Sequence, residues 1–240
     1  MLNTENNILN DITENYKHIM DNIAQAAIQS KRNPEDIELV AVTKTVPVEY
    51  IRHAIDLGVR IIGENRVQEL ISKQQVLDMK ACQSHLIGHL QSNKVQKIVG
   101  QADMIQSVDS LHIAKKIDFY SSQTNTVTNI LIQVNIGNET QKSGVLPEDL
   151  EELIHQILVF SRIKVKGLMA IPPACDSEEE AKPYFDSMYT LFNKMSERKW
   201  GNDSVNFQYL SMGMSADYQT AITCGANLVR VGTALFGSRN

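Results

Sequence analysis

Short apolar runs alternate with longer amphipathic segments along most of the chain. The first run lies within Glu38–Thr45, where the apolar residues 39–42 are consecutive and Pro47 follows soon after. A run of this length is too short for a helix and predicts a strand, about residues 38–43, that is buried on both faces. Similar runs predict seven further strands, at about residues 59–63, 84–89, 103–108, 128–136, 164–170, 206–210 and 227–231.

Amphipathic segments between these runs predict helices. They lie at residues 48–57, 92–99, 110–120, 147–160, 177–198 and 215–224, with another beginning near Glu64. An extra helix, residues 3–30, precedes the first strand. Serines are predicted to cap helices at Ser92, Ser110 and Ser215. Glycines are predicted at the left-handed position after a helix at Gly58, Gly100 and Gly225.

Strict alternation of strands and helices predicts a parallel α/β sheet. Eight strands in about 200 residues favour a closed (β/α)8 TIM barrel over a doubly wound sheet. The doubly wound fold would carry Gly-x-Gly-x-x-Gly after the first strand, where this chain has residues 43–47 with no glycine. Because no linker rich in Pro, Gly or Ser interrupts the pattern, we expect residues 1–240 to form a single domain.

Composition narrows the functional classes. The net charge of −5 argues against a nucleic-acid-binding protein, and no apolar run is long enough for a membrane span. The first ten residues carry no basic residue, so we expect no signal peptide. Three widely spaced cysteines favour a reducing, cytoplasmic location. His85 and His89 are four apart, but along a strand that is about 13 Å, so we expect no metal site.

Polar residues gather where the predicted strands end, and that rim carries the chemistry in such barrels. Lys44 ends the first strand, Ser211–Ser215 follows the seventh, and Gly232 and Thr233 lie at the eighth. An anion is bound well by hydroxyls and free N–H groups, and by a backbone that can approach it closely, as Gly213 allows. Phosphate sites in such barrels often form after strands 7 and 8. The alternative to a phosphate site is a purely structural role, in which the glycines lie in turns, Ser215 caps a helix and the Lys44 side chain extends into solvent.

In a closed barrel, the first and eighth strands are neighbours. The amine of Lys44 would then lie beside the phosphate site, with Arg230 close by. This combination predicts a phosphorylated aldehyde held as an imine, for which pyridoxal 5'-phosphate is the leading candidate. A barrel that binds another phosphorylated metabolite without an imine remains an alternative.

Several segments resemble the pyridoxal phosphate homeostasis protein family, also called the proline synthetase co-transcribed homologue family. The likeness runs from about residue 5 to 237 and rests on residues 42–45, 63–69, 85–94, 142–145, 167–172, 210–215 and 229–237. One departure is Gln83-Ser84, where the family often has a tryptophan before the histidine. The resemblance implies a barrel like the N-terminal domain of alanine racemase.

The resemblance also implies roles for individual residues. Lys44 would carry pyridoxal phosphate as an internal aldimine, Arg230 would approach the pyridine nitrogen, and Asn65 would lie near the ring. The phosphate would be held by Ser211, Ser215, Gly232 and Thr233, with Gly213 in the same loop. The family is regarded as a carrier or regulator in vitamin B6 balance without established turnover, and pyridoxal-phosphate-dependent apoenzymes are candidate recipients.

The residues themselves bear on the choice between a carrier and a racemase-type enzyme. An arginine is a permanent donor, so Arg230 would leave the ring nitrogen unprotonated and weaken the ring as an electron sink. Only residues 233–240 follow the last strand, so we expect no lid domain with a second acid/base group. We therefore favour a carrier, and expect a monomer. For His89 and Tyr218, a role at the cofactor and a structural role both stay open.

Overall fold

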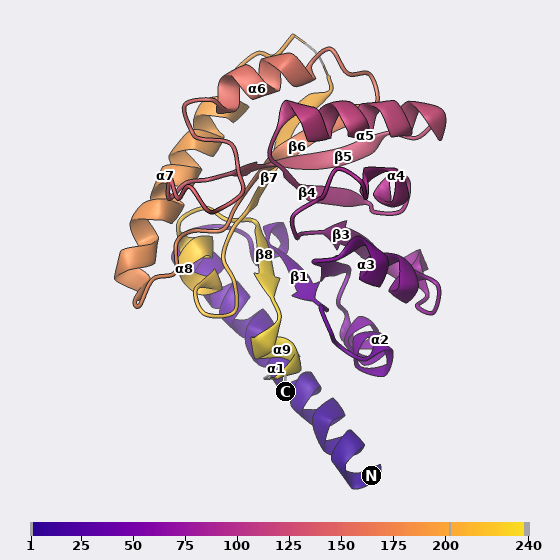
Figure 1. Ribbon diagram of the computed structural model, residues 1–240. Helices are drawn as coiled ribbons and strands as arrows, with labels where there is room; N and C mark the ends of the chain where they lie inside the picture. Colours follow the sequence, from indigo (N-terminus) through magenta and orange to yellow (C-terminus); the bar gives the residue numbers. More distant parts are fainter. Residues whose placement is uncertain (1, 202, 238–240) are drawn as a thin grey trace.

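Eight parallel strands form a closed barrel in the computed structural model, which describes residues 2–201 and 203–237 (Figure 1). Each strand pairs with its neighbour in sequence, and the last pairs with the first. The predicted (β/α)8 barrel is confirmed. The strands are β1 (Glu38–Val42), β2 (Ile61–Glu64), β3 (Gln83–Leu86), β4 (Met104–Val108), β5 (Thr128–Val134), β6 (Ile163–Ala170), β7 (Val205–Ser211) and β8 (Leu228–Val231).

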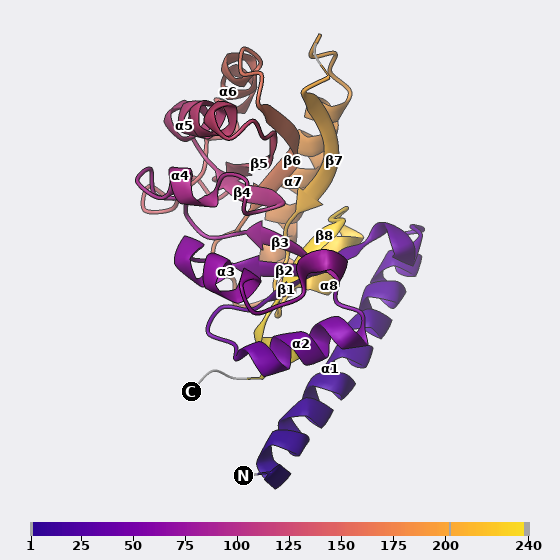
Figure 2. The same cartoon turned by 90° about the vertical axis from the view of Figure 1, so that its right-hand side faces the viewer.

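Helices surround the strands, as the two perpendicular views show (Figures 1 and 2). They are α1 (Leu2–Gln29), α2 (Val48–Leu57), α3 (Val67–Gln74), α4 (Val95–Ile98), α5 (Leu111–Gln123), α6 (Leu150–Ile157), α7 (Glu178–Ser196), α8 (Tyr218–Thr223) and α9 (Thr233–Phe236). Two short 3-10 helices are η1 (Pro34–Asp36) and η2 (Met79–Ala81). The extra helix α1 packs against α2, α8 and α9, so it connects the first helix of the barrel with the last two.

The hydrophobic core has two parts because side chains alternate between the two faces of each strand. The larger part lies between the strands and the helices. The smaller part fills the barrel interior and consists of Val40, Ile61, Ile87, Met104, Leu131, Met169 and Leu228. This inner layer forms a floor beneath the residues at the carboxyl ends of the strands.

Three predicted strand boundaries were wrong by two residues or more. The fifth strand ends at Val134 instead of residue 136. The second strand begins at Ile61 and includes Glu64, which was predicted to start a helix. The third strand ends at Leu86 instead of His89. The reason is Gly88, whose backbone crosses the end of β2 so closely that a Cβ there would lie 2.3 Å from the carbonyl oxygen of Asn65. His89 therefore lies in a loop.

The predicted helix caps met a mixed outcome. Gly58, Gly100 and Gly225 have φ values of 125°, 75° and 107°, which confirms their left-handed positions after helices. Ser110 precedes α5 as predicted, but its side chain makes no capping hydrogen bond. Ser92 and Ser215 do not open helices, since α4 and α8 begin several residues later, after Lys94 and Asp217.

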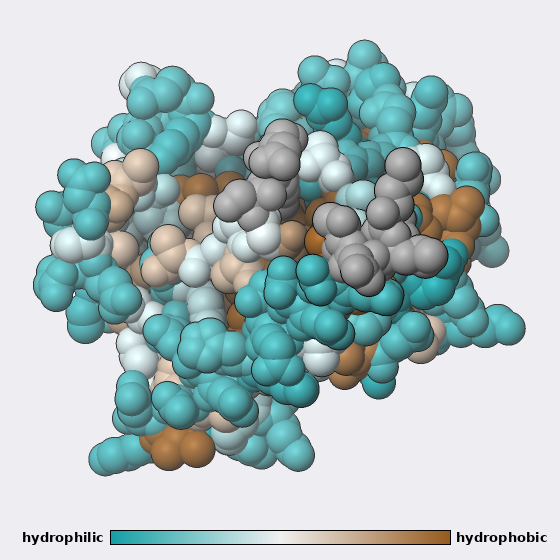
Figure 3. Space-filling model, turned by 90° about the horizontal axis from the view of Figure 1, so that it is seen from below, coloured by the Kyte–Doolittle hydropathy of each residue, from teal (hydrophilic) through white to brown (hydrophobic). Residues whose placement is uncertain are grey.

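Within residues 2–201 and 203–237, no helix combines the length and apolar character needed to cross a bilayer. On the face seen in Figure 3, hydrophilic residues cover most of the surface, and hydrophobic residues show mainly between them.

Candidate functional site

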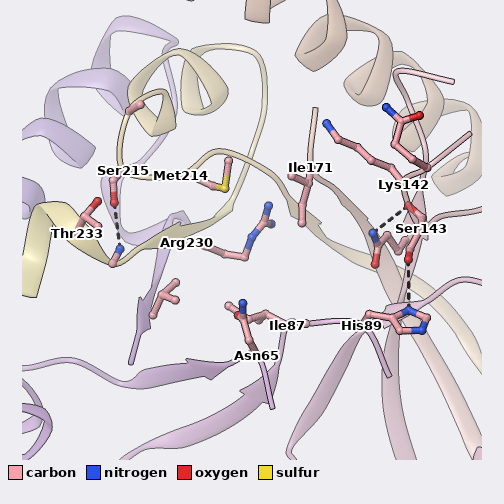
Figure 4. Close-up of a pocket in the computed structure, with 16 residues that line it drawn as sticks. Asn65, Ile87, His89, Lys142, Ser143, Ile171, Met214, Ser215, Arg230 and Thr233 are labelled. Carbon is pink, nitrogen blue, oxygen red and sulfur yellow. Dashed lines mark hydrogen bonds between the residues drawn. The ribbon is translucent and has the colours of Figure 1, made fainter. Parts of the chain in front are cut away.

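A cavity of about 670 Å³ opens where the strands end (Figure 4). Its walls come from the residues that close or follow every strand except β4. They are Val42, Asn65, Ile87, Gly88, His89, Gln133, Gln141, Lys142, Ser143, Ile171, Met214, Ser215, Ala216, Arg230, Gly232 and Thr233. This is the position at which barrels of this class carry their sites.

Five of the residues predicted for the cofactor line this cavity: Asn65, Ser215, Arg230, Gly232 and Thr233. The other three, Lys44, Ser211 and Gly213, do not line it. Ser211 and Gly213 lie directly behind it, because the first accepts a hydrogen bond from the Arg230 side chain and the second accepts one from the Arg230 backbone. The structure therefore brings the seventh and eighth strands together as predicted, with Lys44 apart.

Arg230 stands in the middle of the cavity wall (Figure 4). Only 4% of it is exposed, and burial lowers the pKa of its guanidinium to about 10. One Nη donates to Ser211 Oγ, and the other donates to the Ala170 carbonyl at 2.8 Å. No carboxylate of the described residues forms an ion pair with it. A guanidinium has five N–H donors, so most of them remain for whatever enters the cavity.

Backbone N–H groups converge at the neighbouring edge of the cavity. Ser215 Oγ accepts hydrogen bonds from the N–H groups of Gly232 at 3.1 Å and Ala234 at 3.3 Å (Figure 4). These amides belong to the turn that starts α9, so they offer donors to an oxygen. Ser215 was predicted to cap α8; instead, its hydroxyl oxygen serves the turn after β8.

Gly213 shapes the loop between β7 and α8. Its φ is 90°, and a Cβ there would lie 2.5 Å from Cβ of Ala221 in α8. A side chain would therefore be strained by the backbone and would also collide with the helix. The close backbone approach that the sequence suggested is thus made to α8, while the Gly213 carbonyl holds the backbone N–H of Arg230 at 3.1 Å.

Lys44 lies in the turn that follows β1 and is half-buried. Val42, two residues earlier on the same strand, lines the cavity, whereas Lys44 does not. With the residues that the structure describes, its side chain forms no hydrogen bond or ion pair. The next residue, Thr45, has a φ of 59°, which is unusual for a residue with a branched side chain. The turn therefore has a strained backbone conformation at Thr45, while the Lys44 amine forms no hydrogen bond or ion pair with the described residues.

A buried ion-pair cluster fixes this turn from behind. Lys73 Nζ lies 2.6 Å from the carbonyl oxygen of Thr43, 2.6 Å from Glu64 Oε1 and 2.7 Å from Glu69 Oε1. Thr43 Oγ1 also donates to Glu64 Oε1 at 2.6 Å, and the Thr45 N–H donates to Glu69 Oε1 at 2.6 Å. The residues on both sides of Lys44 are thus bound to one cluster.

The cluster shifts the pKa values of its two carboxylates in opposite directions. Burial raises the pKa of Glu64 above its ordinary value, although hydrogen bonds from Lys73 and Thr43 oppose the change. Burial alone would raise the pKa of Glu69 as well, but hydrogen bonds from Lys73 and Thr45 lower it overall. Sequence reasoning missed this cluster; the four- and five-residue spacing of Glu64, Glu69 and Lys73 was the only trace of it.

The opposite side of the cavity is polar too (Figure 4). Gln133 Nε2 donates to the Ser143 carbonyl at 3.1 Å, and Ser143 Oγ lies 3.3 Å from Nδ1 of His89. Lys142 Nζ lies 2.6 Å from Glu139 Oε2, so its charge is already paired. His89 was left open between two roles, and its exposed ring, 3.6 Å from Asp109, lies at the edge of the cavity.

Tyr218, the other residue left open, is structural in its contacts. It is buried in the core at the start of α8, and its hydroxyl accepts a hydrogen bond from Asn22 of α1 at 3.0 Å. Tyr218 does not line the cavity. Among the described residues, no group of three or more His, Cys, Asp or Glu side chains is arranged to hold a metal ion.

The sequence and the fold are similar to those of known proteins. Residues 12–240 match the family described as alanine racemase, N-terminal domain. The pyridoxal phosphate homeostasis protein of Aquifex aeolicus is 38% identical over 226 residues, which cover 94% of this chain and 97% of that protein. The homologue from Escherichia coli K12, which has the same name, is 38% identical over 97% of this chain and 98% of its own length.

A solved structure of a related protein has a similar fold. PipY of Synechococcus elongatus, in a structure with PLP bound, has a TM-score of 0.77 and 34% identity, covering 90% of this chain and 100% of PipY. The extent of these matches, at more than a third identical residues over almost the full length of both curated proteins, shows that the chain belongs to the pyridoxal phosphate homeostasis protein family.

Proposed function

We propose that this protein binds pyridoxal 5'-phosphate in the cavity, holds it through Lys44, and passes it on without converting a substrate. The names of its relatives and the PLP bound in PipY support this assignment. Pyridoxal-phosphate-dependent apoenzymes as recipients, and a monomeric carrier, belong to the same proposal.

The observation that carries the proposal is Arg230. A buried cation without a carboxylate partner is costly unless an acceptor satisfies its remaining donors. A ligand with a ring nitrogen or an anionic oxygen supplies such an acceptor, and pyridoxal phosphate has both. Its phosphate would meet the N–H groups of Gly232 and Ala234 once Ser215 Oγ turns from them to the ligand, and Asn65 would lie beside the ring.

Two lysines compete for the aldehyde of the ligand. When bound, the ligand supplies an electrophilic carbonyl carbon, and an unprotonated amine attacks it with loss of water. Lys142 lines the cavity, but its amine is already held by Glu139 Oε2 at 2.6 Å. Lys44 has no such partner, and it lies in the turn directly after Val42, a residue that lines the cavity. For this role the Lys44 side chain has to turn toward the cavity, which it does not line in the free protein.

The cavity lining favours holding a ligand over turning one over. Racemisation needs proton-transferring groups on both faces of the substrate carbon. The described lining residues include no carboxylate, tyrosine or cysteine. His89 at the exposed rim and the ion-paired Lys142 are the titratable lining groups besides Arg230. This composition supports the carrier.

The decisive experiment combines visible absorbance with chemical trapping. The purified protein is mixed with pyridoxal phosphate and reduced with borohydride, and the modified lysine is located by mass spectrometry. We expect an imine absorbance band that reduction removes, with the label on Lys44. Lys44→Ala should lose the band, and the matched control Lys142→Ala should keep it.

Other results would change the assignment. A label on Lys142 with an unaffected Lys44→Ala band would overturn the role of Lys44. A protein that stays colourless would leave the second candidate, a barrel for another phosphorylated metabolite. Sustained loss of optical activity from an amino acid, abolished in Lys44→Ala, would overturn the carrier and establish an enzyme.

A further inference from the structure

A row of buried polar side chains crosses the barrel interior from Arg230 on β8. The row continues through Ser211 on β7 and Gln106 on β4 to His85 on β3. Ser211 Oγ lies 2.7 Å from Gln106 Oε1, and Gln106 Nε2 lies 2.9 Å from His85 Nδ1. His85 Nε2 lies 3.3 Å from Oε1 of Gln83 at the far end.

The hydrogen bonds of this row form one consistent set of directions. An arginine only donates, so the Ser211 oxygen must accept and its single hydrogen must pass to Gln106. The Gln106 amide then points its oxygen to Ser211 and its NH2 group to His85. His85 Nδ1 must therefore accept, which places the ring proton on Nε2, where it can be donated to Gln83. With the Gln106 amide turned over, the hydroxyl hydrogen of Ser211 would meet no acceptor in the row.

The surroundings of the row make this order costly to break. Ser211 and Gln106 are fully buried, and His85 is 1% exposed. Burial lowers the pKa of His85 to about 3, so the ring stays neutral, as the row requires. The apolar inner layer beside it, including Met104 on the same strand as Gln106, offers no substitute partner. A buried group that loses its partner pays its full desolvation penalty.

We propose that Gln106 and His85 are positioning residues for Arg230. They fix the Ser211 hydroxyl so that it holds one side of the guanidinium, and the remaining N–H donors then face the cavity. The ligand group that these donors meet is an unprotonated acceptor, the ring nitrogen of pyridoxal phosphate. The ligand half of this inference rests on the function proposed above, whereas the order of the row belongs to the free protein.

Two kinds of variant separate positioning from core packing. Gln106→Met keeps an unbranched side chain of similar size but removes both hydrogen bonds. Met104→Leu is the matched control, because it alters the same strand and the same inner layer without touching the row. His85→Asn keeps an acceptor oxygen near the place of Nδ1, whereas His85→Leu removes it.

The first measurement uses the ligand-free protein and nitrogen-15 NMR. We expect His85 to show an accepting Nδ1 and a protonated Nε2, and the Arg230 side-chain N–H signals to be protected from exchange. Gln106→Met should lose this protection, and Met104→Leu should keep it. A proton on His85 Nδ1, or equal protection in both variants, would overturn the row.

The second measurement is a titration with pyridoxal phosphate. Losing a hydrogen bond that orients a charged group should weaken affinity about tenfold in Gln106→Met and His85→Leu. His85→Asn should restore affinity to within about twofold of the wild type. If Gln106→Met does not fold, the two His85 variants still decide the outcome. Equal affinity in His85→Leu and His85→Asn would refute positioning. A wild type that does not bind pyridoxal phosphate would refute the proposed function, while the NMR result on the row would stand.

Discussion

Replacing Lys73 with methionine removes the cation that holds the turn around Lys44. The side chain of Lys73 is 7% exposed and that of Glu64 is fully buried, so solvent screens their ion pair little. Removing one partner of such a pair leaves the other charge buried alone, at a cost of about 3–5 kcal/mol. For a chain of this length, about 4 kcal/mol corresponds to a fall in Tm of roughly 8–16 °C.

The loss in Lys73→Met should depend on pH, and its sign follows from Glu64. Because the pKa of Glu64 is raised in the folded protein, its contribution to stability is full below the unfolded pKa and is lost as pH rises through the folded pKa. Without Lys73, only the hydrogen bond from Thr43 still opposes burial, and the folded pKa of Glu64 rises further. The deficit should therefore grow as pH rises past the raised folded pKa of Glu64 in the wild type, by up to about 1.4 kcal/mol per pH unit.

Urea unfolding monitored by tryptophan fluorescence provides the assay. Trp200 is the single tryptophan and is buried, so its emission reports loss of the fold. The double variant Lys73→Met with Glu64→Gln removes the stranded charge and should recover much of the stability at pH 8. A deficit in Lys73→Met below about 1 kcal/mol and equal at pH 5 and pH 8 would refute the buried ion pair, since such values are typical of exposed pairs.

Two further predictions concern His85 and Gly213. The depressed pKa of His85, about 3 in the folded protein, means that the unfolded chain binds more protons between pH 3 and about 6.5. The free energy of unfolding should fall with decreasing pH across that window. His85→Asn should reduce the slope of this free energy against pH by up to about 1.4 kcal/mol per pH unit. An unchanged slope, measured by urea titrations at several pH values, would contradict the buried neutral ring. Gly213→Ala should lower the free energy of unfolding by about 2–4 kcal/mol, because its φ is positive and its new Cβ would collide with Ala221. Gly201→Ala is the control: its φ is 68° but the space around it is open, so it should lower the free energy of unfolding by only about 1–2 kcal/mol. Equal shifts in Tm for the two glycine variants would show that the loop tolerates a Cβ beside α8.

The alternation of apolar runs predicted the barrel because burial on both faces leaves a pattern within each strand. All eight strands were placed near their observed positions. The errors came from long-range contacts, as in the third strand, which stops where Gly88 meets the backbone of Asn65. The start of α8 was misplaced for a similar reason, since Ser215 bonds to the turn after β8 instead of its own helix.

The site was predictable where residues follow strand ends, and hidden where polar residues pair inside the fold. Arg230, Gly232 and Thr233 were predicted on the rim from their places at the end of the last strand, and all three line the cavity. Lys73 was passed over because a helical lysine is ordinarily solvated, and only the fold shows the three acceptors around it. Gln106 and His85 interrupt apolar strands visibly, but their partners lie on other strands, so sequence spacing could not join them.

The pairing of β8 with β1 has a consequence for how the protein matures. Val40 and Arg230 are opposite each other across this pairing, although most of the chain lies between them in sequence. During synthesis, β1 and the Lys44 turn leave the ribosome long before β8 and α9. In terms of the proposed site, an incomplete chain therefore has Lys44 but neither Arg230 nor the N–H groups of the last turn. Ligand that binds only the closed barrel favours the finished chain by mass action, so capture of the ligand would mark the moment at which folding is complete.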